Sequence, residues 1–164
     1  MVFDSMEEKA LGYAGSRHAE LGDSLGFGVD GSVWLLHSKD RNHPWAVKLF
    51  RATKPYERER DCYLRLLECK VESVRGFAIP AYLHHDDTWL AIEMTIVRPP
   101  YLLDFAGAIL DEPFDFNEET WESWEMDRME KFEDRWPEVR KVMSELEWFG
   151  IYLSDMHPGN IAFE

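Results

Sequence analysis

The sequence predicts an α+β fold in which an antiparallel sheet carrying one helix is followed by a smaller helical part. Three observations predict it. Strand-like runs separated by turn residues fill most of residues 24–97, and one helix-like segment begins among them at Pro55. Beyond Pro99-Pro100 the apolar residues recur at helical spacing. We therefore expect one lobe over residues 1–98 and a reduced helical lobe over residues 99–164.

The first elements are a pair of strands joined by a turn. Residues 33–36 and 46–50 are rich in β-branched, aliphatic and aromatic side chains, and the polar residues 39–44 between them end in a proline. A glycine-rich stretch over residues 26–31 precedes the first of these runs. We expect a hairpin, entered through a glycine-rich flap that joins two antiparallel strands.

A helix and two further strands complete the first lobe. Pro55 occupies a favoured first-turn position, and Tyr63, Leu66 and Leu67 form an apolar stripe behind it. Residues 77–83 and 89–97 read as two strands. The predicted order is strand, strand, helix, strand, strand.

The second lobe is predicted to be helical and acidic. Residues 111–135 hold eleven acidic residues against three basic ones, and one side of the helical wheel collects an aromatic and apolar stripe, Trp121, Trp124, Met129, Phe132 and Trp136. A second helix begins at Pro137 and ends at Gly150, with an inward face formed by Val139, Val142, Met143, Leu146 and Phe149. Residues 151–164 are expected to be a loop between two short strands.

Composition and net charge limit the classes of binding partner that we expect. With 164 residues and 45% hydrophobic side chains, the chain is long enough for a packed core. Its net charge of −14 repels phosphate backbones and anionic lipid surfaces, so neither nucleic acid nor membrane is an expected partner. The absence of a secretory signal pattern and of an 18-residue apolar run predicts a cytoplasmic location.

The motif with most chemical content is the segment from Gly26 to Val33, which reads G-x-G-x-x-G-x-V. The same glycine spacing serves dinucleotide sites, but those require a helix directly after the glycines, whereas here a hairpin follows. We therefore interpret the glycines as a flap whose backbone N–H groups can approach a phosphate chain. A tight turn that binds no ligand is the alternative reading.

Lys48 is the second candidate. Alternation along residues 46–50 places Ala46, Lys48 and Phe50 on one face of the strand. A lysine among apolar neighbours needs a partner, and Glu59 shares the helical face of Tyr63 and Leu66, whereas Glu57 points away. We predict an ion pair between Lys48 and Glu59 that holds the ammonium toward phosphates beneath the flap.

At these residues the sequence resembles the protein-kinase-like superfamily. The glycine motif matches at Gly26–Val33, and residues 45–48, Trp-Ala-Val-Lys, echo the family's third-strand V-A-I-K. Residues 154–160, Ser-Asp-Met-His-Pro-Gly-Asn, resemble the catalytic loop in the form found in aminoglycoside phosphotransferases and other atypical kinases. The resemblance implies a kinase-like N-lobe, with an antiparallel sheet and an αC-type helix, and a minimal helical C-terminal part.

The resemblance also implies roles for single residues. ATP would be the bound nucleotide, with Asp155 as general base, Lys48 and Glu59 as the catalytic ion pair, and Asn160 as a magnesium ligand. The strand over residues 89–97 would enter the hinge, with Ile92 as gatekeeper. The remaining nucleotide-binding positions would be the flap and strand residues Gly26, Phe27, Gly28, Gly31, Val33 and Ala46, and the backbones of Glu93 and Thr95.

The departures from the family pattern leave two functions open. Leu153-Ser154 stand where the family has His-Arg. The sequence given ends at Glu164 before a D-F-G motif, so we expect magnesium to be weakly held. His157 could replace the family's lysine near the phosphates, and Glu164 could replace the absent magnesium ligand. One function is an ATP-dependent phosphotransferase acting on a hydroxyl of a protein or a small molecule. The other is a catalytically inactive pseudokinase that serves as a scaffold for a protein partner.

Overall fold

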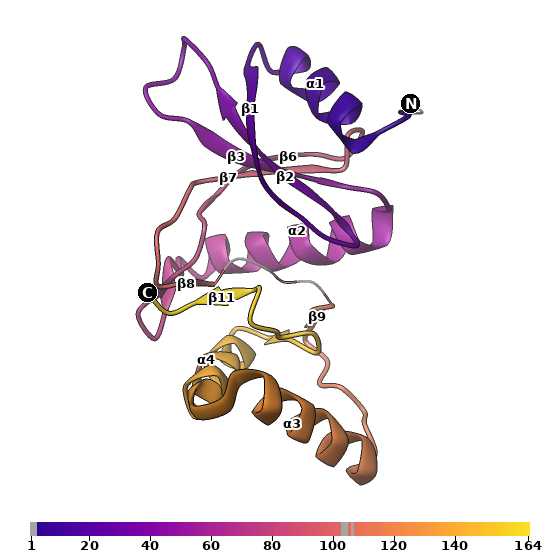
Figure 1. The fold of residues 1–164 in the computed structure, drawn as a ribbon, viewed down its shortest axis with the longest axis vertical. Coiled ribbons are helices and arrows are strands. Elements are labelled where there is room, and N and C mark those ends of the chain that lie inside the picture. The colour runs from indigo at the N-terminus through magenta and orange to yellow at the C-terminus, as the bar shows by residue number, and fades with distance from the viewer. Residues whose placement is uncertain (1–2, 103–104, 106) are drawn as a thin grey trace. The chain divides into compact units, whose positions relative to one another are not determined.

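The computed structural model of the protein describes residues 3–102, 105 and 107–164. The fold is α+β, with an antiparallel sheet and several helices, as the sequence predicts (Figure 1). The chain divides into two compact units, Met1–Arg60 with Ala81–Ile96, and Asp61–Pro80 with Val97–Glu164. Helix α2 (Thr53–Glu68) begins in the first unit and ends in the second. Each unit is described by itself.

The first unit is built on a five-stranded sheet in the order β1-β2-β3-β7-β6. Every neighbouring pair is antiparallel. The predicted hairpin is present, and its two strands pair from Gly31 with Phe50 to Leu36 with Trp45. The strands are β1 (Glu20–Phe27), β2 (Gly31–His37), β3 (Trp45–Phe50), β6 (Tyr82–Asp86) and β7 (Ala91–Met94).

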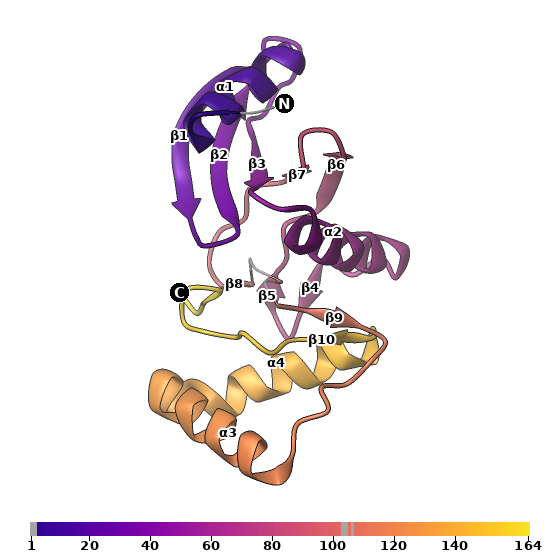
Figure 2. The same cartoon turned by 90° about the vertical axis from the view of Figure 1, so that its right-hand side faces the viewer.

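The two faces of this sheet carry different side chains. Helix α1 (Met6–Ser16) lies across one face of the sheet (Figure 2). On that face Val47 and Leu49 of β3 belong to a buried apolar cluster with Tyr13. Alternation along β3 therefore turns Ala46 and Lys48 to the other face. The sequence predicted this division of β3 into two faces.

Helix α1 was not expected from the sequence, although it carries a recognisable start signal. Ser5 caps the helix by accepting a hydrogen bond from the N–H of Glu8 at 3.1 Å. Glu8 in turn accepts one from the N–H of Asp4 at 2.7 Å. The S-x-x-E pattern signals a capping box, and here the Glu8 carboxylate bonds to the residue before the cap and not to Ser5 itself. The helix is only 11 residues long, and its apolar face is narrow because small alanines supply much of it.

The prediction of a single strand over residues 77–83 is wrong. Two strands occupy this region, β5 (Phe77–Ala78) and β6, and they belong to different sheets. Pro80 lies between them and offers no N–H to a ladder. The strand expected over residues 89–97 is likewise shorter, because Leu90 adopts a positive φ of 50° and β7 ends at Met94.

The second unit combines small sheets with two helices. A sheet in the order β11-β8-β5-β4 contains β4 (Ser73–Val74), β8 (Tyr101–Leu102) and β11 (Ile161–Ala162), and β9 (Ile109–Leu110) pairs with β10 (Ile151–Tyr152). Helix α3 (Glu118–Phe132) leads through a short 3₁₀ turn, η1 (Glu133–Arg135), into α4 (Trp136–Trp148), and the two helices lie side by side (Figures 1 and 2).

The predictions for α4 are confirmed except that Phe149 lies just past its end and is half-buried, whereas those for α3 need correction. Pro137 stands in the first turn of α4, and Val139, Val142, Met143 and Leu146 are buried. Helix α3 begins only at Glu118, because Asn117 caps it by accepting from the N–H of Thr120 at 2.8 Å. Its inward face also differs, since Trp121 and Met129 of the predicted stripe are 39% and 53% exposed, whereas Arg128 is buried.

Within the part of the chain that the structure describes, no helix is both long enough and apolar enough to cross a membrane.

Candidate functional site

A buried ion pair joins β3 to α2. The Lys48 ammonium lies 2.7 Å from Oε2 of Glu59, and both side chains are buried. Glu57, two residues earlier on α2, is exposed, as the helical phase indicated. The ammonium also lies 5.1 Å from the centroid of the Phe50 ring, which shows that Lys48 extends toward the C-terminal end of β3.

The glycine-rich segment joins β1 to β2 beside this pair. Val33 of β2 is the direct partner of Lys48 in the β2–β3 ladder, and Gly26 pairs with Val33 across β1–β2. The turn is closed by a hydrogen bond from the N–H of Gly28 to the carbonyl of Gly31 at 2.8 Å. Phe27 and Val29 at this turn are 89% and 93% exposed.

The glycines of the motif are required for different reasons. A Cβ at Gly31 would overlap the carbonyl oxygen of Leu49 in β3, so close packing of the two strands demands glycine there. A Cβ at Gly26 or Gly28 would meet nothing within 4 Å. Packing of the described residues therefore leaves Gly26 and Gly28 unexplained, and they leave the backbone open to close approach by a ligand.

Sequence reasoning missed Arg51, which contacts the same turn. Its NH1 donates to the carbonyl of Gly28 at 3.1 Å and to that of Val29 at 3.3 Å. The signal available in the sequence was weak, because an arginine just after a strand is usually solvated. A second cation therefore lies at the glycine-rich turn.

Strand β7 carries the residues proposed for the hinge. Ile92 pairs with Lys48, and Glu93 pairs with Val47 on one side and His84 on the other, so its backbone lies within the sheet. The Glu93 carboxylate is fully buried and accepts hydrogen bonds from Tyr13 at 3.0 Å and Arg17 at 2.7 Å. Burial, followed by the charge of Glu93, raises the pKa of Tyr13.

The N–H of Thr95 is also engaged in the structure. It donates to the carbonyl of Ala81 at 2.9 Å, and the Thr95 hydroxyl accepts from the N–H of Ala81 at 2.8 Å. In this arrangement the Thr95 N–H is occupied by the protein itself. Recognition of adenine by that group would require the contact with Ala81 to open.

The segment resembling a catalytic loop lies in the second unit. Leu153 and Met156 are buried and anchor it, whereas the Asp155 side chain between them is 60% exposed. Asn160 is buried, its N–H donates to the carbonyl of His157 at 2.9 Å, and its Nδ2 lies 3.5 Å from the carbonyl of Asp155. The loop therefore presents one carboxylate to solvent and buries one amide.

A tryptophan and an arginine of α3 hold this loop, and sequence reasoning missed the arginine. The carbonyl of Ser154 accepts from Nε1 of Trp124 at 2.8 Å and from NH2 of Arg128 at 3.0 Å. The same Arg128 nitrogen lies 3.7 Å from Oδ1 of Asp155. The available signal was that Arg128 lies four residues after Trp124 and four before Phe132, on the helical face that packs inward.

Asn160 is the residue that the resemblance implies as a magnesium ligand. Its Oδ1 is buried and has no hydrogen-bond partner among the described residues, although buried amide oxygens are normally satisfied. An amide oxygen is a ligand that magnesium accepts. No cluster of three or more His, Cys, Asp or Glu side chains suited to a metal occurs in the described ranges. His157 accepts from the N–H of Gly159 at 3.1 Å, and Glu164 is exposed.

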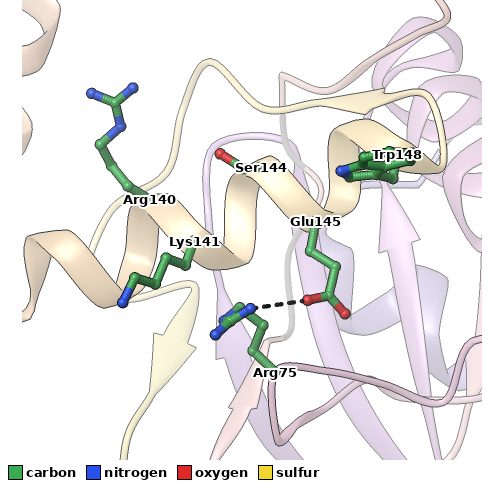
Figure 3. Close-up of a pocket in the computed structure, with 6 residues that line it drawn as sticks. All are labelled: Arg75, Arg140, Lys141, Ser144, Glu145 and Trp148. Carbon is green, nitrogen blue, oxygen red and sulfur yellow. Dashed lines mark ion pairs between the residues drawn. The ribbon is translucent and has the colours of Figure 1, made fainter.

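A surface groove of about 410 Å³ in the second unit is a separate feature (Figure 3). It is lined by Arg75, Arg140, Lys141, Ser144, Glu145 and Trp148. Arg75 pairs with Glu145 at 3.5 Å, and Arg140 pairs with Glu125 of α3. Because these carboxylates neutralise two of its three cations, the groove lacks the concentrated positive charge of an anion site.

The candidate residues thus fall into two groups, Lys48, Glu59 and the glycine-rich turn in the first unit, and Asp155 with Asn160 in the second. No protein-family model matches the sequence, and a comparison with curated proteins gave no match.

Proposed function

We propose that this chain is a kinase-like ATP-binding protein whose nucleotide lobe is the first unit. The observation that carries the proposal is the buried Lys48–Glu59 ion pair beside the glycine-rich turn. A lysine and a glutamate both removed from water are costly unless they hold each other in place. An ion pair of this kind keeps an ammonium extended at a fixed point, which suits it to binding phosphate oxygens.

The order of elements supports the kinase-like N-lobe. A glycine-rich turn joins β1 to β2, the lysine lies on β3, the glutamate lies on the following helix, and β7 returns to pair with β3. This is the order that the resemblance implies, with α2 in the place of the αC-type helix. Val33 and Ala46 lie on the same face as Lys48 and offer an apolar surface to adenine.

Phosphotransfer to a hydroxyl is the activity we propose, because residues 154–160 resemble a catalytic loop. Asp155 would accept the proton of the acceptor hydroxyl, since it is the exposed carboxylate of the loop that Trp124 and Arg128 hold. The acceptor is a protein or a small molecule. Magnesium would be held through the buried Oδ1 of Asn160, and when bound it would neutralise charge on the phosphates.

A pseudokinase is the second candidate, and one observation favours it. Leu153-Ser154 stand where the family has His-Arg before the catalytic Asp, which is a departure from the catalytic-loop pattern of the family. In that case ATP would bind without turnover, and the lobe would serve as a scaffold for a protein partner.

Calorimetric titration with ATP tests the proposal. The wild-type protein should bind ATP, and Lys48→Met should weaken binding at least tenfold because a charged bond to phosphate is lost. Since that change leaves the buried Glu59 carboxylate without its ammonium, Lys48→Met/Glu59→Gln provides a version with neither charge, and circular dichroism monitors the fold of both. Glu57→Ala is the control and should bind as the wild type does.

Two outcomes decide between the candidate functions. Release or transfer of phosphate that Asp155→Asn abolishes without loss of ATP affinity would establish the phosphotransferase. ATP binding with no turnover in the wild-type protein would establish the pseudokinase. A wild-type protein that does not bind ATP would contradict the proposal as a whole.

A further inference from the structure

Arg51 ties the glycine-rich turn to the end of β3. Besides the two hydrogen bonds from its NH1 to the carbonyls of Gly28 and Val29, its backbone N–H donates to the carbonyl of Asp30 at 2.9 Å. Three consecutive carbonyls at the tip of the turn are therefore bound by one residue. The turn is positioned by β3, the strand that also carries Lys48.

The guanidinium of Arg51 has donors left over. NH1 carries two hydrogens, and the carbonyls of Gly28 and Val29 account for both. Nε and NH2 make no hydrogen bond, and the side chain forms no ion pair, in the ranges that the structure describes. Among the described residues Arg51 bonds only to neutral carbonyls, although the chain has 32 acidic residues against 18 basic ones. Its charge remains available to an anion.

The spare donors have the geometry of a phosphate-binding fork. The Nε–H and one N–H of NH2 are parallel and match two oxygens of one phosphate group. Lys48 extends toward the same end of β3, since its ammonium lies by the ring of Phe50, the residue next to Arg51. Phe50 in turn pairs with Gly31 of the turn. Two cations and the glycine-rich turn therefore gather at one end of the β2–β3 pair.

We infer that Arg51 is a second phosphate-binding residue, holding the turn with NH1 and binding the terminal phosphates of the nucleotide with Nε and NH2. The inference rests on the proposed function, which assigns a nucleotide to this face of the sheet. It explains how a protein with a net charge of −14 receives a triphosphate, because Lys48 alone opposes a strong long-range repulsion. Because Arg51 would contact only the phosphates, it should not strengthen the binding of adenosine, which has none.

The test compares Arg51→Gln with Arg58→Gln, which removes the same charge from an exposed position on α2. Calorimetry with ATP and with adenosine is run on the wild-type protein and both variants. Arg51→Gln should weaken ATP binding by about tenfold to a hundredfold, the loss expected for charged hydrogen bonds, and leave adenosine binding unchanged. Arg58→Gln should reproduce wild-type affinity for both ligands.

A spectroscopic measurement separates direct contact from support of the turn. The ¹⁵Nε–Hε resonance of Arg51, identified by its loss in Arg51→Gln, should shift on addition of ATP and not on addition of adenosine. An unshifted resonance, or equal ATP affinity in the two variants, overturns the inference while ATP binding by the wild-type protein upholds the proposed function. If the wild-type protein binds no ATP, the proposed function fails and the role of Arg51 fails with it.

Discussion

Gly28 and Gly31 belong to one motif, but they lie in different surroundings. Gly31 faces the backbone of β3 so closely that any side chain would overlap the Leu49 carbonyl. Gly28 has open space where a side chain would be and does not adopt a positive φ. The fold therefore requires Gly31, whereas Gly28 is free to serve a ligand.

Alanine substitution should separate the two roles. We expect Gly31→Ala to lower the free energy of unfolding by about 1–3 kcal/mol, as overpacking does. Gly28→Ala should change it by less than about 0.5 kcal/mol, the range of an exposed substitution, yet weaken ATP binding because the methyl group obstructs approach to the backbone. Urea denaturation and calorimetry measure the two quantities. Equal destabilisation by both changes would contradict this division.

At the scale of elements, Asp87 connects the turn between β6 and β7 to helix α2. Its Oδ1 accepts from the hydroxyl of Tyr56 at 2.7 Å and from NH1 of Arg60 at 3.0 Å. Glu59, the partner of Lys48, lies between these two residues in the sequence of α2. The contact therefore fixes the first turns of the helix that carries half of the ion pair.

The Asp87 contact should make stability depend on pH in acid. The hydrogen bonds from Tyr56 and then Arg60 lower the pKa of Asp87 below its ordinary value of 3.8. A carboxyl whose pKa is lowered on folding stabilises the protein above its unfolded pKa, and this contribution is lost as pH falls through the folded pKa. The difference in unfolding free energy between wild type and Asp87→Asn should therefore be constant near neutrality and shrink below pH 3.8.

Glu57→Gln is the matched control for that experiment, because Glu57 is an exposed acid on the same helix. Its difference from wild type should stay small across the same pH range. A difference for Asp87→Asn that persists unchanged into strong acid would show that the charge of Asp87 plays no part in holding α2.

Local patterns predicted some elements well and others poorly. The β2–β3 hairpin and α4 were predictable because a turn or a proline bounds a strongly periodic run. Helix α1 was not, since its inward face relies on Ala10 and Ala14, which add little to an apolar pattern. The change of sheet at Pro80 depends on partners distant in the chain, which no local window contains.

The candidate site likewise contains some contacts that the sequence predicts and others that it does not. Alternation on a strand and phase on a helix were enough to pair Lys48 with Glu59. The contacts of Arg51 with Gly28 and of Arg128 with Ser154 span 23 and 26 residues, and they depend on how the chain folds back. Arginine on a surface and arginine at a site have the same local sequence signature, so only the tertiary arrangement distinguishes them.

At the scale of the whole molecule, negative charge is concentrated in one region. Residues 111–135 carry eleven acidic residues against three basic ones, and most of these acids are exposed. Exposed like charges repel one another, and dissolved salt screens that repulsion over about 10 Å at 0.1 M. The folded protein therefore contains a repulsive contribution that depends on ionic strength.

Salt should accordingly stabilise the protein. We expect the midpoint of thermal unfolding to rise by a few degrees when sodium chloride is increased from about 10 mM to about 150 mM, because self-repulsion is screened. Glu119→Gln/Glu122→Gln, which removes two exposed charges from α3, should reduce the rise. A midpoint that falls with salt would mean that attractive surface ion pairs outweigh the net charge.

The contacts of Arg128 have a consequence for cooperativity in the second unit. Because Trp124 and Arg128 both bind the carbonyl of Ser154, the loop that carries Asp155 loses both of these hydrogen bonds when α3 opens. Helix and loop then exchange with solvent as one cooperative segment, and the amide of Asn160, bonded to His157, should become exposed whenever the middle of α3 frays. The fraction of time that α3 stays closed therefore limits how long the Asp155 carboxylate keeps the position seen in the structure.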